Sequence, residues 1–493
     1  MSILKKNLIM SKLYVFGIGG TGARVLKSLT MLLAVGVKLG ANEVVPIIID
    51  PDFSCADLTR TIDQMKRYKK IREAISTTLT DANKNRFFKT LVNIDNVSLT
   101  LTETRDRSFR DYIGYSHMQN DELKSNYALT SMLFSDKNLN SNMNVGFKGN
   151  PNIGSVVLNQ FLQSDEFMNF ASSFEDGDSI FVVSSIFGGT GASGFPLLVK
   201  NLRNLPDTIP NHNLIKNAVI GALSVLPYFR VSKDESSEID SSSFISKTKA
   251  ALSYYDRNLN EVNVVYYISD NLTKEYDNSE GGTQQKNAAH FVELASALSI
   301  IDFSFMSRDN LVVINGVPQE ITYKEFGVND QVENLIFNNL SEEVNSMVQR
   351  KMLQYQLFVK YIKNQISDSA EKQTWSKDSG LGRDFITSNF FQSTLNDFNM
   401  NYLEWLREMS TNRRGFSPFS DEDEKKGLFH IMSGVDPKKL GFFGLGKDNY
   451  TLFDDSLNTE VQNVSKLLNQ ESKFFELFYR ATDSLINKKF NVK

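Results

Sequence analysis

The sequence has a single cysteine, four histidines and no excess of basic residues, and each scarcity excludes a class of site or partner. Cys55 alone forms no intrachain disulfide and builds no cysteine-rich metal site, which is typical of a reducing compartment. The histidines lie far apart, without the spacing of metal ligands. Lys and Arg number 54 against 58 Asp and Glu, a net charge of −4, so broad nucleic-acid binding is not expected.

Long hydrophobic runs are also missing. Apolar stretches such as Val44–Ile49 fall far short of the roughly 20 residues that cross a bilayer. Residues 1–10 place only a few apolar residues after two lysines, too few for a secretory signal. We therefore expect no membrane span and a cytoplasmic location.

The 493 residues are too many for one small domain, and 41% of them are hydrophobic, so two or three units with a real core are expected. Short apolar runs alternate with amphipathic stretches, which is the pattern of βαβ units and of a mainly parallel sheet. Each run is continuously apolar, as in strands that helices cover on both faces. The predicted strands are Leu13–Phe16, Val44–Ile49, Ser179–Ser185, Ala218–Leu226 and Val262–Ile268.

The chain is expected to divide into a sheet domain, a connecting helix and a second domain. Residues 1–283 form the sheet domain, with a charged, helical insertion near 53–140. Residues 284–305 carry apolar side chains along most of their length, which predicts a buried central helix and the loop after it. Residues 306–493 form a C-terminal domain of α+β type that is rich in helices. The expected fold class is therefore α/β with a mainly parallel sheet.

Three glycine-rich segments lie next to predicted strands, where phosphate groups bind in α/β proteins. Gly17–Gly22 directly follows a strand and opens a helix, so its backbone amides and the helix N-terminus favour an anion. Gly149–Gly154 is a turn sequence that, taken alone, reads as a surface loop. Phe187–Gly194 again separates a strand from a helix.

The order of these segments resembles that of the tubulin/FtsZ superfamily and, within it, of the divergent bacterial tubulin-like proteins. Gly188–Gly191 (GGTG) is similar to the phosphate-loop signature of that superfamily, and Pro196 falls where bacterial division-ring members also have proline. Gly17–Gly22 resembles their first phosphate loop, and Gly149–Gly154 resembles the loop under the terminal phosphate. Together, the matching segments cover about the first 305 residues.

This resemblance implies a guanine nucleotide, GTP or GDP, with Mg²⁺. Successive backbone amides and a threonine hydroxyl make a phosphate cradle that needs no lysine. The resemblance assigns the α- and β-phosphates to Gly19, Gly20, Thr21 and Gly22, the β- and γ-phosphates to Gly188, Gly189, Thr190 and Gly191 with Ala192 beside them, and further contacts to Gly149, Asn150, Asp50 and Asp52.

Asn287, at the start of the predicted central helix, is similar in placement to the asparagine that reads the guanine edge in the superfamily. An amide side chain both donates and accepts hydrogen bonds, as that recognition requires. The alternative is that Asn287 caps the start of the helix.

The loop after the central helix departs from the superfamily pattern. In polymerising members an NxDFxD-like motif there completes the nucleotide site of the next subunit. Asp302 and Phe303 are kept, but Ile300 replaces the asparagine and Phe305 replaces the second acid. Asp302 would be the catalytic carboxylate, and loss of the second acid predicts slow or absent hydrolysis. The alternative is that Asp302 only bonds an amide near the helix end.

The resemblance thus implies a GTP-binding protein that associates head to tail into filaments or a scaffold, with at most weak GTPase activity, and whose C-terminal domain could bind a protein partner. One alternative is a monomeric nucleotide-binding regulator of a protein partner, which the altered Asp302–Phe305 segment favours. Another is a Rossmann-type NAD(P) enzyme that uses Gly17–Gly22, with Asp50 on the ribose.

Overall fold

The computed structural model describes residues 11–492, apart from 53, 76–85, 100, 102–103, 105–106, 144–145, 148, 233–243, 272–273, 277–281, 285, 327–331, 413, 421–425, 439–448 and 468. Within these residues, an eight-stranded sheet lies at the centre, and all of its strand pairs are parallel. Its strands in spatial order are β12 (Thr322–Phe326), β8 (Val264–Ile268), β6 (Val219–Val225), β5 (Ser179–Ser185), β1 (Lys12–Ile18), β2 (Glu43–Ile49) and β3 (Leu91–Val92), with β4 (Ser98–Leu99) also paired to β2.

All five predicted strands are present in this sheet, with ends that differ by at most two residues. Their sequences are continuously apolar because helices cover both faces: every residue of β6 is buried, and only Ser179 of β5 is partly exposed. The predicted mainly parallel α/β fold class is therefore confirmed.

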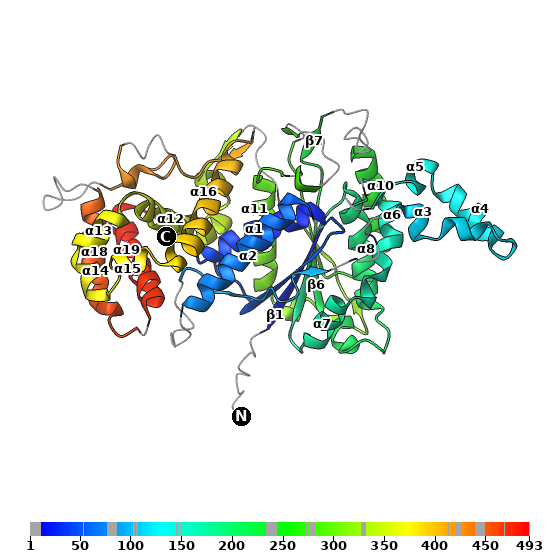
Figure 1. Cartoon of the computed structure of the whole chain (residues 1–493), viewed down its shortest axis with the longest axis horizontal. Helices are drawn as coiled ribbons and strands as arrows, with labels where there is room; N and C mark the ends of the chain where they lie inside the picture. Colours follow the sequence, from blue (N-terminus) through cyan, green and yellow to red (C-terminus); the bar gives the residue numbers. More distant parts are fainter. Residues whose placement is uncertain are drawn as a thin grey trace, which may run out of the picture.

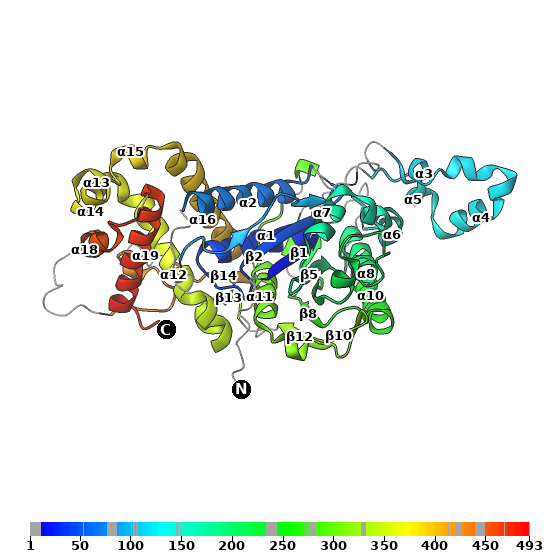
Figure 2. The ribbon, with the colours of Figure 1, turned by 90° about the horizontal axis from the view of Figure 1, so that it is seen from below.

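Helices pack on both faces of the sheet (Figure 1). The helices α1, α2 and α11 lie on one side, and α6, α8 and α10 lie on the other (Figures 1 and 2). The helices of this region are α1 (Gly19–Ala34), α2 (Ala56–Ala74), α6 (Pro151–Val157), α7 (Asp165–Ser173), α8 (Gly189–Arg203), α9 (His212–Lys216), α10 (Phe244–Asn258) and α11 (Phe291–Phe305).

The central helix α11 begins later than the apolar pattern predicts, at Phe291. His290 ends the preceding extended segment, and its Nδ1 atom accepts a hydrogen bond from the Val292 amide at 3.0 Å. The Glu293 carboxylate returns a bond to the His290 amide at 3.1 Å, which completes a capping box. The expectation that Asn287 caps this helix is therefore wrong, because His290 holds that position.

The sheet takes strands from two segments for which the sequence suggested other roles. The edge strand β12 pairs with β8, so the sheet continues beyond residue 305. Within residues 53–140, β3 and β4 extend the sheet on β2. Later in the same segment, α3 (Phe109–Tyr112), α4 (Lys124–Leu133) and α5 (Asp136–Leu139) stand away from the body at one end of the molecule (Figures 1 and 2).

The C-terminal helices gather at the opposite end of the long axis (Figure 1). They are α12 (Glu342–Asn364), α13 (Ile366–Lys372), α14 (Thr374–Ser379), α15 (Arg383–Ile386), α16 (Asp397–Ser410), α18 (Asn449–Val464) and α19 (Gln470–Lys489). Short strand pairs accompany the sheet and these helices: β10 (Val313–Ile314) with β11 (Val317–Pro318), β13 (Asn334–Leu335) with β14 (Gly415–Phe416), and β7 (Phe229–Val231) with β9 (Lys274–Tyr276).

Two aromatic residues from the segment after α2 join this helical region to the sheet region. The Phe87 ring lies 5.0 Å from the Tyr355 ring and 5.4 Å from the Tyr479 ring. The Phe88 ring, on a backbone with φ +51°, lies 5.0 Å from the Phe398 ring. Both side chains are fully covered, so the two regions share one hydrophobic core.

Among the helices in the described ranges, none is both long enough and apolar enough to cross a membrane.

Candidate functional site

The strand order places a topological switch between β1 and β5. From β1 the chain passes through α1 to β2 on one side, and from β5 it passes through α8 to β6 on the other. The loops at the carboxyl ends of these two strands therefore diverge and leave a crevice, which is where α/β sheets bind ligands. The loops in question contain Gly17–Gly22 and Phe187–Gly194.

The structure brings all three glycine-rich segments together at this crevice. A Cβ atom on Gly189 would lie 2.9 Å from the Gly149 nitrogen and 3.1 Å from the Asn150 nitrogen, so only glycine permits this approach. Gly19 has φ +71°, and a Cβ atom there would lie 3.5 Å from the Thr190 Cβ. Loops that are about 170 residues apart in sequence thus meet around Thr190.

Both long helices that start here begin without a cap. Neither α1 nor α8 has a side-chain hydrogen bond at its N-terminus or an acidic residue in its first turn. The first amides of each helix are therefore left for an external acceptor, and both helix dipoles favour a negative charge at the crevice. The Thr190 hydroxyl, partly exposed, makes no hydrogen bond within the part of the chain that the structure describes.

The predicted residues of the first loop differ in exposure. Gly20 is partly open, whereas Gly19, Thr21 and Gly22 are buried in the first turn of α1. A Cβ atom on Gly22 would lie 2.4 Å from the Gly17 carbonyl carbon, so this glycine lets the helix pack against its strand. In the third loop, Gly188, Thr190 and Ala192 are partly open, whereas Gly189 and Gly191 are buried.

The two acids after β2 are buried at the rim of the same crevice. Asp50 accepts the Asp52 amide at 3.0 Å, and burial raises the pKa of Asp50 to about 7. Asp52 accepts the Ser54 amide and hydroxyl and, at 2.6 Å, the Gly282 amide. Asp52 therefore holds the loop in shape, and a protonated Asp50 lowers the negative charge that a phosphate would meet.

A buried ion cluster supports the first loop, and the sequence did not reveal it. The Arg24 guanidinium lies 2.9 Å from Asp57 Oδ2 and 2.5 Å from Glu293 Oε1, with all three side chains at most 5% exposed. It also donates to the Tyr228 hydroxyl at 2.9 Å and to the Thr21 hydroxyl at 3.4 Å. The cluster thus joins the first turn of α1 to the start of α11.

Asn287 lies next to this cluster. Its side-chain Nδ2 donates to Asp57 Oδ2 at 3.2 Å, and its backbone amide donates to Asp57 Oδ1 at 3.1 Å. The Asn287 side chain is thus connected to Thr21 through Asp57 and Arg24. The donor half of its amide is already engaged by the protein.

Lys247 is a second residue of the crevice that the sequence did not single out. Its Nζ atom donates to the Gly149 carbonyl oxygen at 2.9 Å, from helix α10. Gly149 has φ +74°, so the lysine holds a backbone conformation that favours glycine. A lone lysine outside any motif gives no signal in the sequence.

Asp302 lies far from the other predicted residues. It occupies the last turn of α11, about 18 Å along the helix axis from His290 at the other end. Its Oδ2 atom accepts the Tyr266 hydroxyl at 2.6 Å and the Lys324 ammonium at 2.6 Å. Its partners are therefore two side chains, and the expected bond to an amide is not among those that the described residues make.

Comparisons with known proteins include a distant similarity to a solved structure. No protein-family model matches the chain, and a search of curated proteins finds no significant match. Among solved structures, CetZ2 from Haloferax volcanii, in a GTPγS-bound protofilament, matches with 14% identity and a TM-score of 0.28. The alignment covers 61% of this chain and 60% of the CetZ2 chain.

Proposed function

We propose that this chain binds a guanine nucleotide in the crevice between β1 and β5 and associates head to tail with other copies. The observation that supports nucleotide binding is the convergence of three glycine-rich loops around Thr190, beside two uncapped helix N-termini. Such an arrangement offers many backbone amides to phosphate oxygens. The choice of guanine rests on the resemblance of the loop sequences and their order.

The crevice suits a magnesium-bound nucleotide better than a protein-held metal. Within the described residues, no group of three or more His, Cys, Asp or Glu side chains could hold a metal ion. Mg²⁺ commonly keeps several waters and binds through phosphates with one or two carboxylates. Asp50 and Asp52 are the carboxylates at this rim, and bound Mg²⁺ would offset phosphate charge there.

The position of Asp302 supports the proposed head-to-tail association. The carboxylate is too far along α11 to reach the loops of its own chain, so it could act only on a nucleotide bound to another copy. A repeated heterologous contact of this kind produces an open filament unless the rotation closes a ring. Because Lys324 and Tyr266 already engage Asp302, we expect hydrolysis to be slow or absent.

The direct test of nucleotide binding is to identify the nucleotide that remains with the purified protein and to repeat the measurement with Thr190→Ala. We expect GTP or GDP in the parent protein and a loss of at least about tenfold in affinity in the variant, because a phosphate contact is removed. Thr208→Ala, at an exposed threonine outside the crevice, is the matched control. Full retention of nucleotide by Thr190→Ala would contradict the assigned loop.

Self-association is tested separately by light scattering at high protein concentration with GTP or GDP. The proposal expects larger particles with GTP, and an Asp302→Asn variant that assembles normally but releases phosphate more slowly than the parent. Unchanged particle size in every condition would favour the monomeric regulator instead.

One observation favours a second candidate, an NAD(P) enzyme. The strand order is the one that dinucleotide-binding domains use, and Asp50 directly follows β2, where such domains place the ribose-binding acid. Against this, Asp50 is only 6% exposed and already accepts the Asp52 amide. Thermal protection by NAD but not by GTP would support the second candidate.

A further inference from the structure

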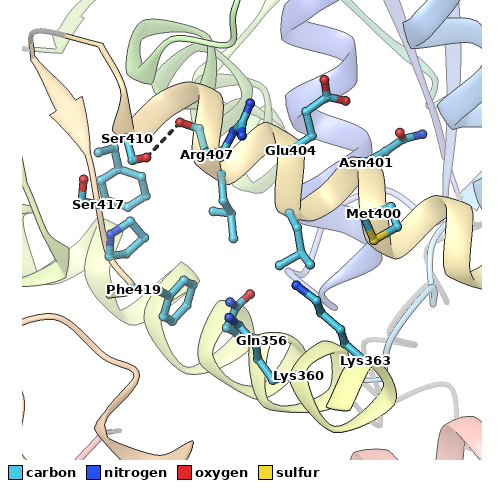
Figure 3. Close-up of a pocket in the computed structure, with 14 residues that line it drawn as sticks. Gln356, Lys360, Lys363, Met400, Asn401, Glu404, Arg407, Ser410, Ser417 and Phe419 are labelled. Carbon is cyan, nitrogen blue, oxygen red and sulfur yellow. Dashed lines mark hydrogen bonds between the residues drawn. The ribbon is translucent and has the colours of Figure 1, made fainter. Parts of the chain in front are cut away.

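A cavity of about 520 Å³ lies in the C-terminal region, between α12, α16 and the segment that follows β14 (Figure 3). This volume is within the range of small-molecule sites, roughly 300–1,000 Å³. None of the residues that line the cavity belongs to the glycine-rich loops. The cavity is therefore separate from the crevice described above.

The walls of the cavity differ in chemistry. Helix α16 supplies Met400, Leu403 and Leu406 beside polar side chains, and the β14 segment supplies Phe416 and Phe419, so each of these walls carries an apolar patch. Helix α12 faces them with polar side chains, and Figure 3 shows Gln356 and Lys363 directed into the space between the helices. A ligand that fits both walls must itself be amphipathic.

Gln356 presents an unsatisfied amide to this space. The residue is 3% exposed, and its Oε1 atom has no hydrogen-bond partner within the described residues. An unpaired buried acceptor is unfavourable, so a rotation of the Gln356 amide that brings Oε1 to an N–H group of a ligand gains binding energy. The glutamine Nε2 group can donate in return to a carbonyl oxygen.

The cavity also has an excess of positive charge from side chains without ion pairs. Lys363 and Arg407 are exposed at its edge, and neither forms an ion pair with any described residue. The acid in the lining, Glu404, lies 3.6 Å from the Lys286 ammonium outside the cavity. An anionic group on the ligand is therefore favoured beside Lys363.

We propose that this cavity binds a small amphipathic carboxylate that contains an amide, of the N-acyl amino acid class. The acyl chain packs against Met400, Leu403 and Phe419, the amide pairs with Gln356, and the carboxylate pairs with Lys363. The three contacts correspond to the apolar patches, the Gln356 amide and the Lys363 ammonium of the lining.

The ligand side of this proposal is tested with three probes and the full-length protein by isothermal titration calorimetry. N-octanoylglycine has the chain, the amide and the carboxylate; N-octanoylglycinamide lacks the charge; decanoate lacks the amide. We expect N-octanoylglycine to bind about fivefold to tenfold more tightly than either of the others, as expected for one lost polar contact. Equal affinity for all three probes, or no saturable binding of N-octanoylglycine at millimolar concentration, would overturn the proposal.

The protein side is tested with two variants. Lys363→Met should weaken N-octanoylglycine and decanoate by about fivefold and leave N-octanoylglycinamide unchanged. Gln356→Met should weaken N-octanoylglycine and N-octanoylglycinamide and leave decanoate unchanged. Lys372→Met, at an exposed lysine on α13, is the matched control. Variants that bind all three probes like the parent would overturn the assignment of these side chains, and since Lys363 is exposed, its replacement leaves the fold intact.

Discussion

The two ends of the central helix α11 each hold an acid against a base, but in opposite surroundings. At the first end, Arg24 lies between Asp57 and Glu293, with the three side chains 5%, 0% and 1% exposed. At the other end, Asp302 pairs with Lys324 at 2.6 Å, with side chains 47% and 35% exposed. Although the charged atoms lie at similar distances, the two interactions should contribute differently to stability, because water screens only the second pair.

Burial explains why the first cluster needs all of its members. Desolvation raises the pKa of Glu293 above its ordinary value, although the Arg24 guanidinium opposes that rise. Without Arg24, two carboxylates would share a site with little access to water. The exposed pair faces no such penalty, so its members can be exchanged or rearranged at low cost.

The largest effect is expected for Arg24→Met. The substitution leaves Asp57 and Glu293 without their buried partner, which should lower the free energy of unfolding by about 3–5 kcal/mol. Chemical denaturation measures this loss, with Arg257→Met at an exposed arginine as the control. A loss below about 1 kcal/mol would mean that burial does not make the Arg24 cluster more important for stability than the exposed Asp302–Lys324 pair.

A combined variant, Arg24→Met with Asp57→Asn and Glu293→Gln, sharpens that result. Because it removes all three charges together, it should recover part of the stability that Arg24→Met loses. No recovery would show that the cluster matters through packing and not through charge.

An intermediate effect is expected for Asp50→Asn, since Asp50 is a buried acid whose described partner is an amide and not a base. Its folded pKa of about 7 lies above the ordinary 3.8, so the folded chain retains a proton that the unfolded chain loses between these values. Stability therefore falls as pH rises from about 4 to 7. The neutral asparagine avoids this fall and should be more stable than the parent at pH 8 by about 2–4 kcal/mol.

Thermal melts from pH 4 to pH 8 measure this difference, with Asp176→Asn at an exposed acid as the control. If the parent and Asp50→Asn show the same dependence on pH, Asp50 does not titrate in this window.

The smallest effect is expected at the exposed end of α11. A double-mutant cycle of Asp302→Asn and Lys324→Met should give a coupling free energy of about 0.2–1 kcal/mol, which decreases with added salt. Chemical denaturation of the parent, the two single variants and the double variant, at low and at high ionic strength, gives the free energies of unfolding for this cycle. A coupling free energy as large as the loss expected for Arg24→Met would mean that exposure to water does not weaken the Asp302–Lys324 pair.

The sequence predicts the main strands of the sheet well, because a continuous run of apolar residues can be recognised within each strand alone. Strands such as Ser179–Ser185 are continuously apolar, and the structure confirms that helices cover both of their faces. The short strands β3 and β4 were missed, since two residues each give no periodic pattern. The edge strand β12 has the sequence TYKEF, which mixes polar and apolar residues without a strand pattern. Its membership of the sheet is seen only from its pairing with β8.

The sequence marked the candidate site by its glycine-rich loops and by the acids Asp50 and Asp52 after β2. The loops around Gly19, Gly149 and Gly189 meet as their order suggested, because parallel strands bring their carboxyl ends to one edge. The buried cluster of Arg24 gave no signal, since charged residues on a helix usually face water. His290 is buried, and its capping role could not be predicted because it depends on where α11 begins.

The aromatic contacts of Phe87 and Phe88 also constrain the order of events during synthesis. Tyr479, which Phe87 meets, is translated roughly 390 residues later. At about 5–20 residues per second, the ribosome needs on the order of 20–80 s to supply it. During that interval two phenylalanine rings of the sheet region lack their final cover. Uncovered apolar side chains of this kind make an emerging chain more prone to aggregation.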